Sequence, residues 1–122
     1  RELTGLHVTV ANWVGESLLR DPATMLDLKL QACPEVLQGQ DPDVERLGPA
    51  FYRAYADSRG VPLTLGIGAG FLAQATPGQI RDRVQHYVRA GGQAGRFSLY
   101  LCNVSGATPP ENLRAAVAAA RS

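Results

Sequence analysis

Short apolar runs alternate along this chain with amphipathic stretches, a pattern that predicts strands and helices in regular succession. Four apolar runs have the length and composition of buried strands: Leu6–Ala11, Glu35–Gln38, Leu63–Ile67 and Phe97–Leu101. Each is followed by a stretch with apolar residues at helical spacing, and no long polar linker intervenes. Four consecutive strand–helix units predict an α/β fold with a parallel sheet, formed by residues 1–122 as a single domain.

Asp-Pro and Thr-Pro pairs predict where three of the helices begin, at Asp21, Thr76 and Thr108. The first residue of each pair caps free N–H groups, and proline suits the first helical position. The helices from Thr76 and Thr108 are expected to end at Ala90 and near Ala119. Another helix is expected over Leu47–Arg59, with Tyr52 and Tyr55 as packing residues. The helix from Asp21 is expected to bury four apolar residues: Met25, Leu26, Leu28 and Leu30.

Composition narrows the class of protein. The 122 residues are 45% hydrophobic and 19% charged, which is typical of a globular domain. A formal net charge of +1, with both signs scattered, does not support nucleic-acid binding. No apolar run approaches the roughly 20 residues of a membrane span. Two cysteines do not make a disulfide framework, so a cytoplasmic location is the default expectation.

Cys102 and Asn103 directly follow the last predicted strand, at the end of a parallel sheet where ligands bind. A ligand-contacting thiol and a buried structural thiol are equal alternatives for Cys102, because free cysteine also packs as a small hydrophobe. Cys33 is expected in the core and His86 in solvent. The glycines from Gly66 to Gly70 lack the lysine of a phosphate-binding loop, so they are interpreted as a turn over the sheet.

Three stretches resemble the carboxyl-terminal half of the uroporphyrinogen decarboxylase superfamily: Gly66–Val84, Gly95–Phe97 and Cys102–Val117. The last is the most specific, with a cysteine-bearing loop and then Thr-Pro-Pro-Glu-Asn-Leu at the start of the final helix. Two further stretches, Leu6–Thr9 and Gln38–Asp41, resemble strand ends of that family more loosely. The superfamily includes the decarboxylase and zinc-dependent methyltransferases, which transfer methyl groups between corrinoid proteins and thiols such as coenzyme M. The resemblance implies the second half of a TIM barrel.

The resemblance also implies a metal site. In the methyltransferase branch, a His-x-Cys pair and a later cysteine hold zinc; His7 matches the histidine and Cys102 the later cysteine. Thr9 stands in place of the middle cysteine, and a hydroxyl is a poor zinc ligand. Either a carboxylate such as Asp41 or Glu16 completes the zinc site, or the metal is lost.

Further site residues are expected at the same strand ends. Asn12, Asp41 and Asn103 are the expected substrate-binding residues. The methyl donor implied by the resemblance is a corrinoid carried on a partner protein, and the acceptor is a thiol or another small molecule.

A half barrel has two open sheet edges, which aggregate unless they are covered. A homo-oligomer, a complementary half-barrel chain or a flatter repacked layer would each cover them. Three functions stay open: a methyltransferase-type domain or subunit, a non-catalytic binding or assembly module derived from the same family, and a tetrapyrrole decarboxylase-like fragment. Neither nucleic acid nor membrane is an expected partner.

Overall fold

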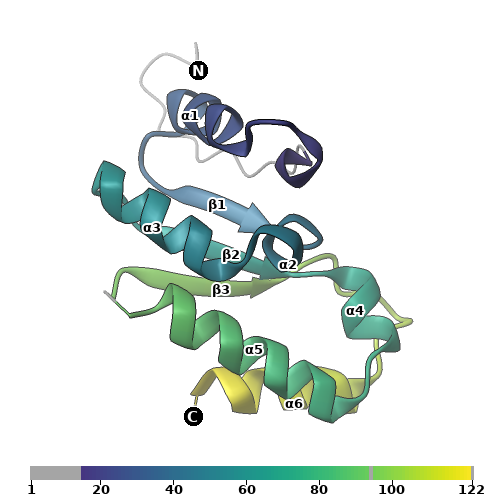
Figure 1. The fold of residues 1–122 in the computed structure, drawn as a ribbon. Helices are drawn as coiled ribbons and strands as arrows, with labels where there is room; N and C mark the ends of the chain where they lie inside the picture. Colours follow the sequence, from purple (N-terminus) through teal and green to yellow (C-terminus); the bar gives the residue numbers. More distant parts are fainter. Residues whose placement is uncertain (1–14, 94, 122) are drawn as a thin grey trace, which may run out of the picture.

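The computed structural model describes residues 15–93 and 95–121. Its sheet has three parallel strands in the order β1-β2-β3 (Figure 1): β1 (Leu37–Gln40), β2 (Leu63–Ile67) and β3 (Phe97–Leu101). Helices alternate with these strands, which confirms the α/β class and the parallel sheet. The predicted strand Leu6–Ala11 lies outside the described residues.

The described residues form seven helical segments beside the three strands. In chain order they are η1 (Glu16–Leu18), α1 (Pro22–Ala32), α2 (Asp43–Leu47), α3 (Pro49–Arg59), α4 (Ala69–Gln74), α5 (Pro77–Gly91) and α6 (Pro110–Arg121). In the described part of the chain, no helix has both the length and the apolar character needed to cross a bilayer.

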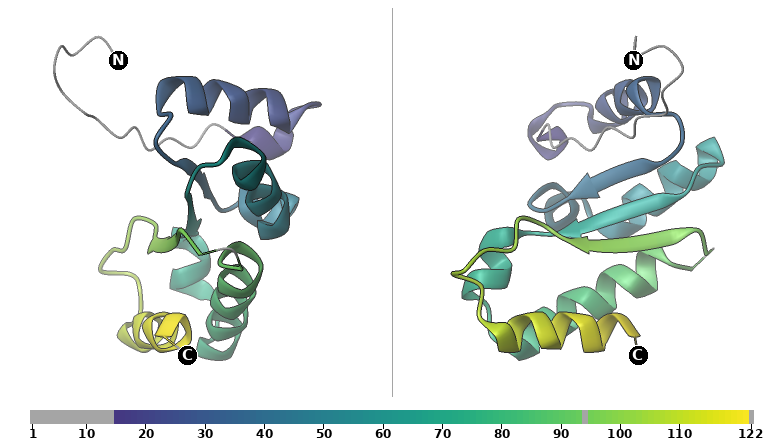
Figure 2. Two further views of the ribbon diagram at one scale, coloured as in Figure 1. Left: turned by 90° about the vertical axis from the view of Figure 1, so that its left-hand side faces the viewer. Right: turned by 180° about the vertical axis from the view of Figure 1, so that it is seen from behind.

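One face of the sheet is apolar and is covered by α3 and α5. Leu37, Leu63 and Phe97 share a row across the three strands, and Leu65 and Leu99 share the next such row. Tyr52 of α3 packs so closely on Gly39 of β1 that a Cβ there would lie 2.6 Å from its ring. Figure 2 shows both helices on the same side of the strands. The core therefore lies between this face and the two helices.

The opposite face of the sheet is polar and open in the described part of the chain (Figure 2). Side chains alternate along a strand, so this face takes the residues between the apolar ones: Gln38, Gln40, Thr64, Gly66, Ser98 and Tyr100. The hydroxyl oxygens of Thr64 and Ser98 lie 2.7 Å apart across the two strands. A polar face that no described helix covers is the natural place to look for a binding site.

Local signals set several boundaries as expected. At the start of α5, Thr76 Oγ1 accepts the Gln79 N–H (3.2 Å) and Gln79 Oε1 accepts the Thr76 N–H (2.9 Å). The helix ends at Gly91, one residue beyond the prediction. Cys33 is buried and His86 is exposed, as predicted.

Three predicted boundaries were wrong. The strand expected at Glu35–Gln38 runs from Leu37 to Gln40, because its ladder begins where the Leu37 N–H meets the Pro62 carbonyl. The helix expected over Leu47–Arg59 begins at Pro49, because Leu47 is the last residue of α2 and Gly48, whose φ is 89°, separates the two helices. A residue before proline avoids the α region, and Gly48 precedes Pro49.

The last helix begins at Pro110 rather than Pro109. The Thr108 hydroxyl accepts the Ser105 N–H (3.4 Å) within the preceding loop. The Asn112 side chain donates to the carbonyls of Leu72 (2.8 Å) and Ala75 (3.0 Å). These bonds tie α6 to the end of α4, a helix that begins at Ala69, within the glycine run interpreted as a turn.

The buried side of α1 also differs from the prediction. Leu26 is fully buried, but Leu28 is 48% exposed, and the charged Lys29 is buried instead. Lys29 belongs to a buried ion pair described below, and that pair sets the rotation of α1 against the sheet edge.

Candidate functional site

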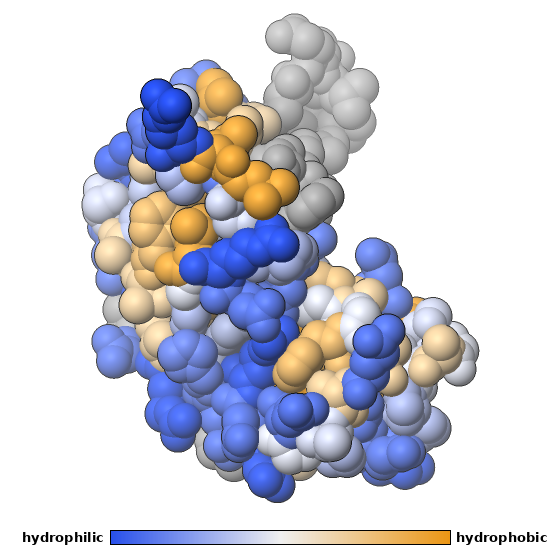
Figure 3. Space-filling model, turned by 45° about the vertical axis from the view of Figure 1, so that its right-hand side comes forward, coloured by the Kyte–Doolittle hydropathy of each residue, from blue (hydrophilic) through white to orange (hydrophobic). Residues whose placement is uncertain are grey.

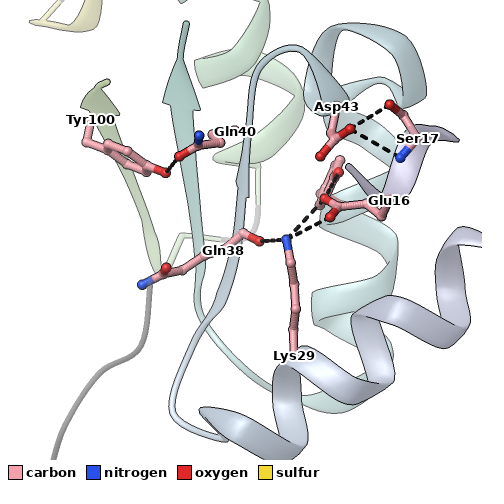
Figure 4. Close-up of polar contacts among 8 residues, drawn as sticks. Glu16, Ser17, Lys29, Gln38, Gln40, Asp43 and Tyr100 are labelled. Carbon is pink, nitrogen blue, oxygen red and sulfur yellow. Dashed lines mark hydrogen bonds and ion pairs between the residues drawn. The ribbon is translucent and has the colours of Figure 1, made fainter. Parts of the chain in front are cut away.

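A thiol, an amide and a phenol meet at the carboxyl ends of the strands, on the open face. Gln40 is the last residue of β1, Tyr100 lies in β3, and Cys102 follows β3 directly. Gln40, Gly66 and Tyr100 form one row across the sheet. The Tyr100 hydroxyl donates to Gln40 Oε1 (2.8 Å; Figure 4), and the Cys102 thiol donates to the same oxygen over 3.8 Å.

Gly66 makes this cluster sterically feasible. A Cβ at this position would lie 2.6 Å from the Tyr100 ring and 2.7 Å from Cys102 Sγ. No side chain fits between β1 and β3 there, so the phenol and the thiol occupy the space above the central strand. Gly66 lies within β2, inside the strand predicted over Leu63–Ile67.

The cluster is neutral at physiological pH. Burial raises the pKa of the Cys102 thiol to about 11; the neighbouring Tyr100 hydroxyl lowers it and the Asp41 charge raises it. Burial, followed by the proximity of Cys102, also raises the pKa of Tyr100. Cys102 is 6% exposed, so it is a buried, protonated thiol in the free protein.

Asp41 lies at the same end of the sheet, but its carboxylate is bound on the helix side. It accepts the Gly68 N–H (3.0 Å), Arg83 Nη1 (3.3 Å) and the Tyr87 hydroxyl. Arg83 also pairs with Glu45. The arrangement anchors the loop after β2 to α5, and it leaves the carboxylate of Asp41 fully engaged.

Asn103 is exposed, next to Cys102, with a φ of 47° in the left-handed region. The sequence-predicted residues Asp41, Cys102 and Asn103 thus gather at one end of the sheet, with the Asp41 carboxylate turned toward α5. The other two predicted site residues, His7 and Asn12, lie outside the described residues. Gln40 and Tyr100 were missed as site residues.

A second polar cluster lies at the outer edge of β1 (Figure 4). The buried ammonium of Lys29 pairs with Glu16 (3.0 Å) and donates to the Gln38 carbonyl (2.9 Å). The Tyr52 hydroxyl donates to the same carboxylate, and Ser17 donates to Asp43. Glu16 is therefore neutralised by Lys29, and the suggestion that it completes a metal site is not supported by this geometry.

The residues around Cys102 do not by themselves fit a zinc ion. Within residues 15–93 and 95–121, no three histidine, cysteine or carboxylate side chains gather closely enough to hold a metal. The groups bonded to or beside the thiol are an amide and a phenol, which are weak zinc ligands. A zinc site would need His7 and at least one more ligand from outside this cluster.

A cavity on the helix side of the sheet competes with the open face as a binding site. A space of about 310 Å³ lies on the helix side, between α2, α3 and α5, and His86, Asp82 and Arg83 are among its lining residues. Figure 3, turned toward the carboxyl ends of the strands, shows apolar residues in separate patches divided by a polar band. The helix-side cavity contains no cysteine.

Comparisons with known proteins found no match to this chain, whether among family models, curated proteins or solved structures.

Proposed function

We propose that this chain supplies the carboxyl-terminal half of a barrel of the uroporphyrinogen decarboxylase type, with the open face of the sheet lining the interior. The sequential strand order, with α3 and α5 on one face, supports this proposal because successive units of a TIM barrel have the same arrangement. Residues 6–11 would form the first of four strands. A second copy or a complementary half-barrel chain would close the barrel.

The proposed activity is methyl transfer to a thiol or another small molecule, with a corrinoid on a partner protein as donor. The observation that carries the proposal is the convergence of Cys102, Gln40 and Tyr100 on the open face at the strand ends. Ligands of α/β sheets bind at this end. The cluster is uncharged and offers both hydrogen-bond donors and hydrogen-bond acceptors. These groups suit a small polar molecule as the methyl acceptor.

A non-catalytic binding module is the second candidate function. It is favoured by the raised pKa of Cys102 and by the poor fit of zinc to the residues around the thiol. A buried, protonated thiol contacts a ligand without acting as a nucleophile. The decarboxylase-like alternative has weaker support, because no lysine or arginine lies on the described open face of the strands to bind substrate carboxylates.

The test compares the two buried cysteines. Methyl transfer from a methylated corrinoid to coenzyme M is measured for the wild type, Cys102→Ser and the matched control Cys33→Ser. Both substitutions place a hydroxyl in a buried site, so their effects on folding should be similar. We expect activity in the wild type and in Cys33→Ser and its loss in Cys102→Ser.

Zinc content and coenzyme M binding are measured on the same samples. Ligand binding that depends on Cys102, without methyl transfer, would establish the binding module instead. Equal transfer by Cys102→Ser and the wild type would exclude both functions at this site. Zinc bound by the wild type and lost in Cys102→Ser would show that ligands beyond the described residues complete a metal site.

A further inference from the structure

In the described part of the chain, the outer edge of β3 has no partner strand. Strand order places β3 at one end of the sheet. The Leu63 N–H bonds to the Arg96 carbonyl and the Cys102 N–H bonds to the Ile67 carbonyl, so these alternate positions face β2. The peptide groups of Phe97, Leu99 and Leu101 therefore point outward, because ladder bonds alternate along a strand. An edge of this kind is a template for another strand.

An apolar groove runs beside that edge, between β3 and α6. It has a volume of about 160 Å³, and its lining is Leu99, Leu101, Ala116, Val117, Ala120 and Arg121. Val117 is 44% exposed although it is a large apolar side chain. A strand paired with β3 would place every second side chain at this groove and the others on the open face. The fitting segment is therefore apolar at alternate positions only.

The opposite edge of the sheet is already covered at one position. The N–H groups of Leu37 and Asp41 bond toward β2, so the Gln38 carbonyl points to the outer edge of β1. This carbonyl accepts the ammonium of Lys29 (2.9 Å), which is itself buried against Glu16. The Gln38 carbonyl is thus already bonded at this edge, whereas no described side chain bonds to the outward peptide groups of β3.

We propose that the edge of β3, with its groove, binds residues 6–11 of a second copy of this chain. The segment reads Leu-His-Val-Thr-Val-Ala, with Leu6, Val8 and Val10 at one set of alternate positions and His7 and Thr9 at the other. The first set matches the groove, and the second matches the polar face that carries Ser98 and Tyr100. Reciprocal exchange between two copies closes the assembly as a dimer.

The inference rests on the proposed function in so far as a partner closes the sheet. Its test measures mass rather than chemistry, so the failure of either proposal can be distinguished from the failure of the other.

The experiment measures the mass of the full chain by light scattering at high micromolar concentration. Val117→Glu places a charge in the groove, and Thr9→Pro removes a donor that faces β3 when the segment runs parallel to it. Leu28→Glu is the matched control, because Leu28 is a helical residue with 48% exposure on α1. Circular dichroism confirms that each variant is folded. We expect the wild type and Leu28→Glu to have twice the monomer mass and each of the other two variants to be monomeric.

Mixing the two monomeric variants is the decisive step. The Thr9→Pro copy retains an intact β3 edge, and the Val117→Glu copy retains an intact segment, so one of the two contacts can form. We expect a one-to-one heterodimer that is weaker than the wild-type dimer. A monomeric wild type, a dimer that survives either substitution, or a mixture that stays monomeric would each overturn the proposal.

Discussion

The Tyr100 hydroxyl donates to Gln40 Oε1 over 2.8 Å, although β2 lies between the two strands that carry these residues. The contact exists because the residue between them is Gly66. Its missing side chain leaves room above the central strand for the Tyr100 ring. The bond joins the first and third strands on the open face, and the thiol of Cys102 shares its acceptor. The candidate site thus depends on a glycine at one position.

Replacing that glycine should disrupt the site. Gly66→Ala places a Cβ 2.6 Å from the Tyr100 ring and 2.7 Å from Cys102 Sγ, so we expect a loss of about 1–3 kcal/mol in the free energy of unfolding. Gly70→Ala is the control, since nothing lies within 4 Å of its added Cβ in α4. Urea denaturation measures both; similar effects of the two substitutions would contradict the packing of this cluster.

The Cys102 thiol should react slowly with alkylating agents. Its pKa of about 11 means that the alkylation rate rises with pH without levelling off below that value, whereas an ordinary thiol levels off near about 8.5. The rate is measured against pH in a Cys33→Ser background, where Cys102 is the only thiol. A plateau near the ordinary thiol pKa would show that Cys102 is not desolvated as described.

Stability should fall in alkaline solution. Burial raises the pKa of Tyr52, Tyr87 and Tyr100 above the ordinary value of 10.0, so the folded protein keeps protons that the unfolded chain loses. These three tyrosines therefore contribute to the free energy of unfolding below about pH 10, and this contribution is lost as the pH rises above that value. Cys102 adds a loss that begins near its ordinary value of 9.0. Melting temperatures measured against pH should decline less steeply in Tyr87→Phe than in the wild type.

The buried ion pair at the β1 edge gives a further prediction. Lys29→Met leaves the fully buried Glu16 without its cation, so we expect a loss of about 3–5 kcal/mol. Adding Glu16→Gln should recover much of that loss. The exposed pair Arg59–Asp27 is the control, and Arg59→Ala should cost no more than about 1 kcal/mol. Chemical denaturation of these three variants and the wild type separates the outcomes.

The sequence predicted β2 and β3 to the residue because each is a short apolar run bounded by turn residues. It placed β1 two residues too early. Gln38 and Gln40 are polar because they lie on the open face of the sheet, and in the sequence alone such residues resemble a turn. The half barrel of four strands stays a prediction, because its first strand, Leu6–Ala11, lies outside the described residues.

The candidate site could be predicted only in part. Cys102 stood out because it follows a strand, a local signal. Gln40 and Tyr100 are 60 residues apart and form no local pattern, so only the register of β1, β2 and β3 brings them together. Lys29 was missed for a similar reason: its charge is compensated by Glu16, 13 residues earlier, and helical spacing alone assigned Leu28 to the interior.

Ligand binding on the open face beside Cys102 is tested most directly by mapping amide chemical shifts during titration with coenzyme M. We expect the largest shifts on Gln40, Gly66, Tyr100 and Cys102. Shifts concentrated instead at Asp82 and His86, which line the helix-side cavity, would contradict it.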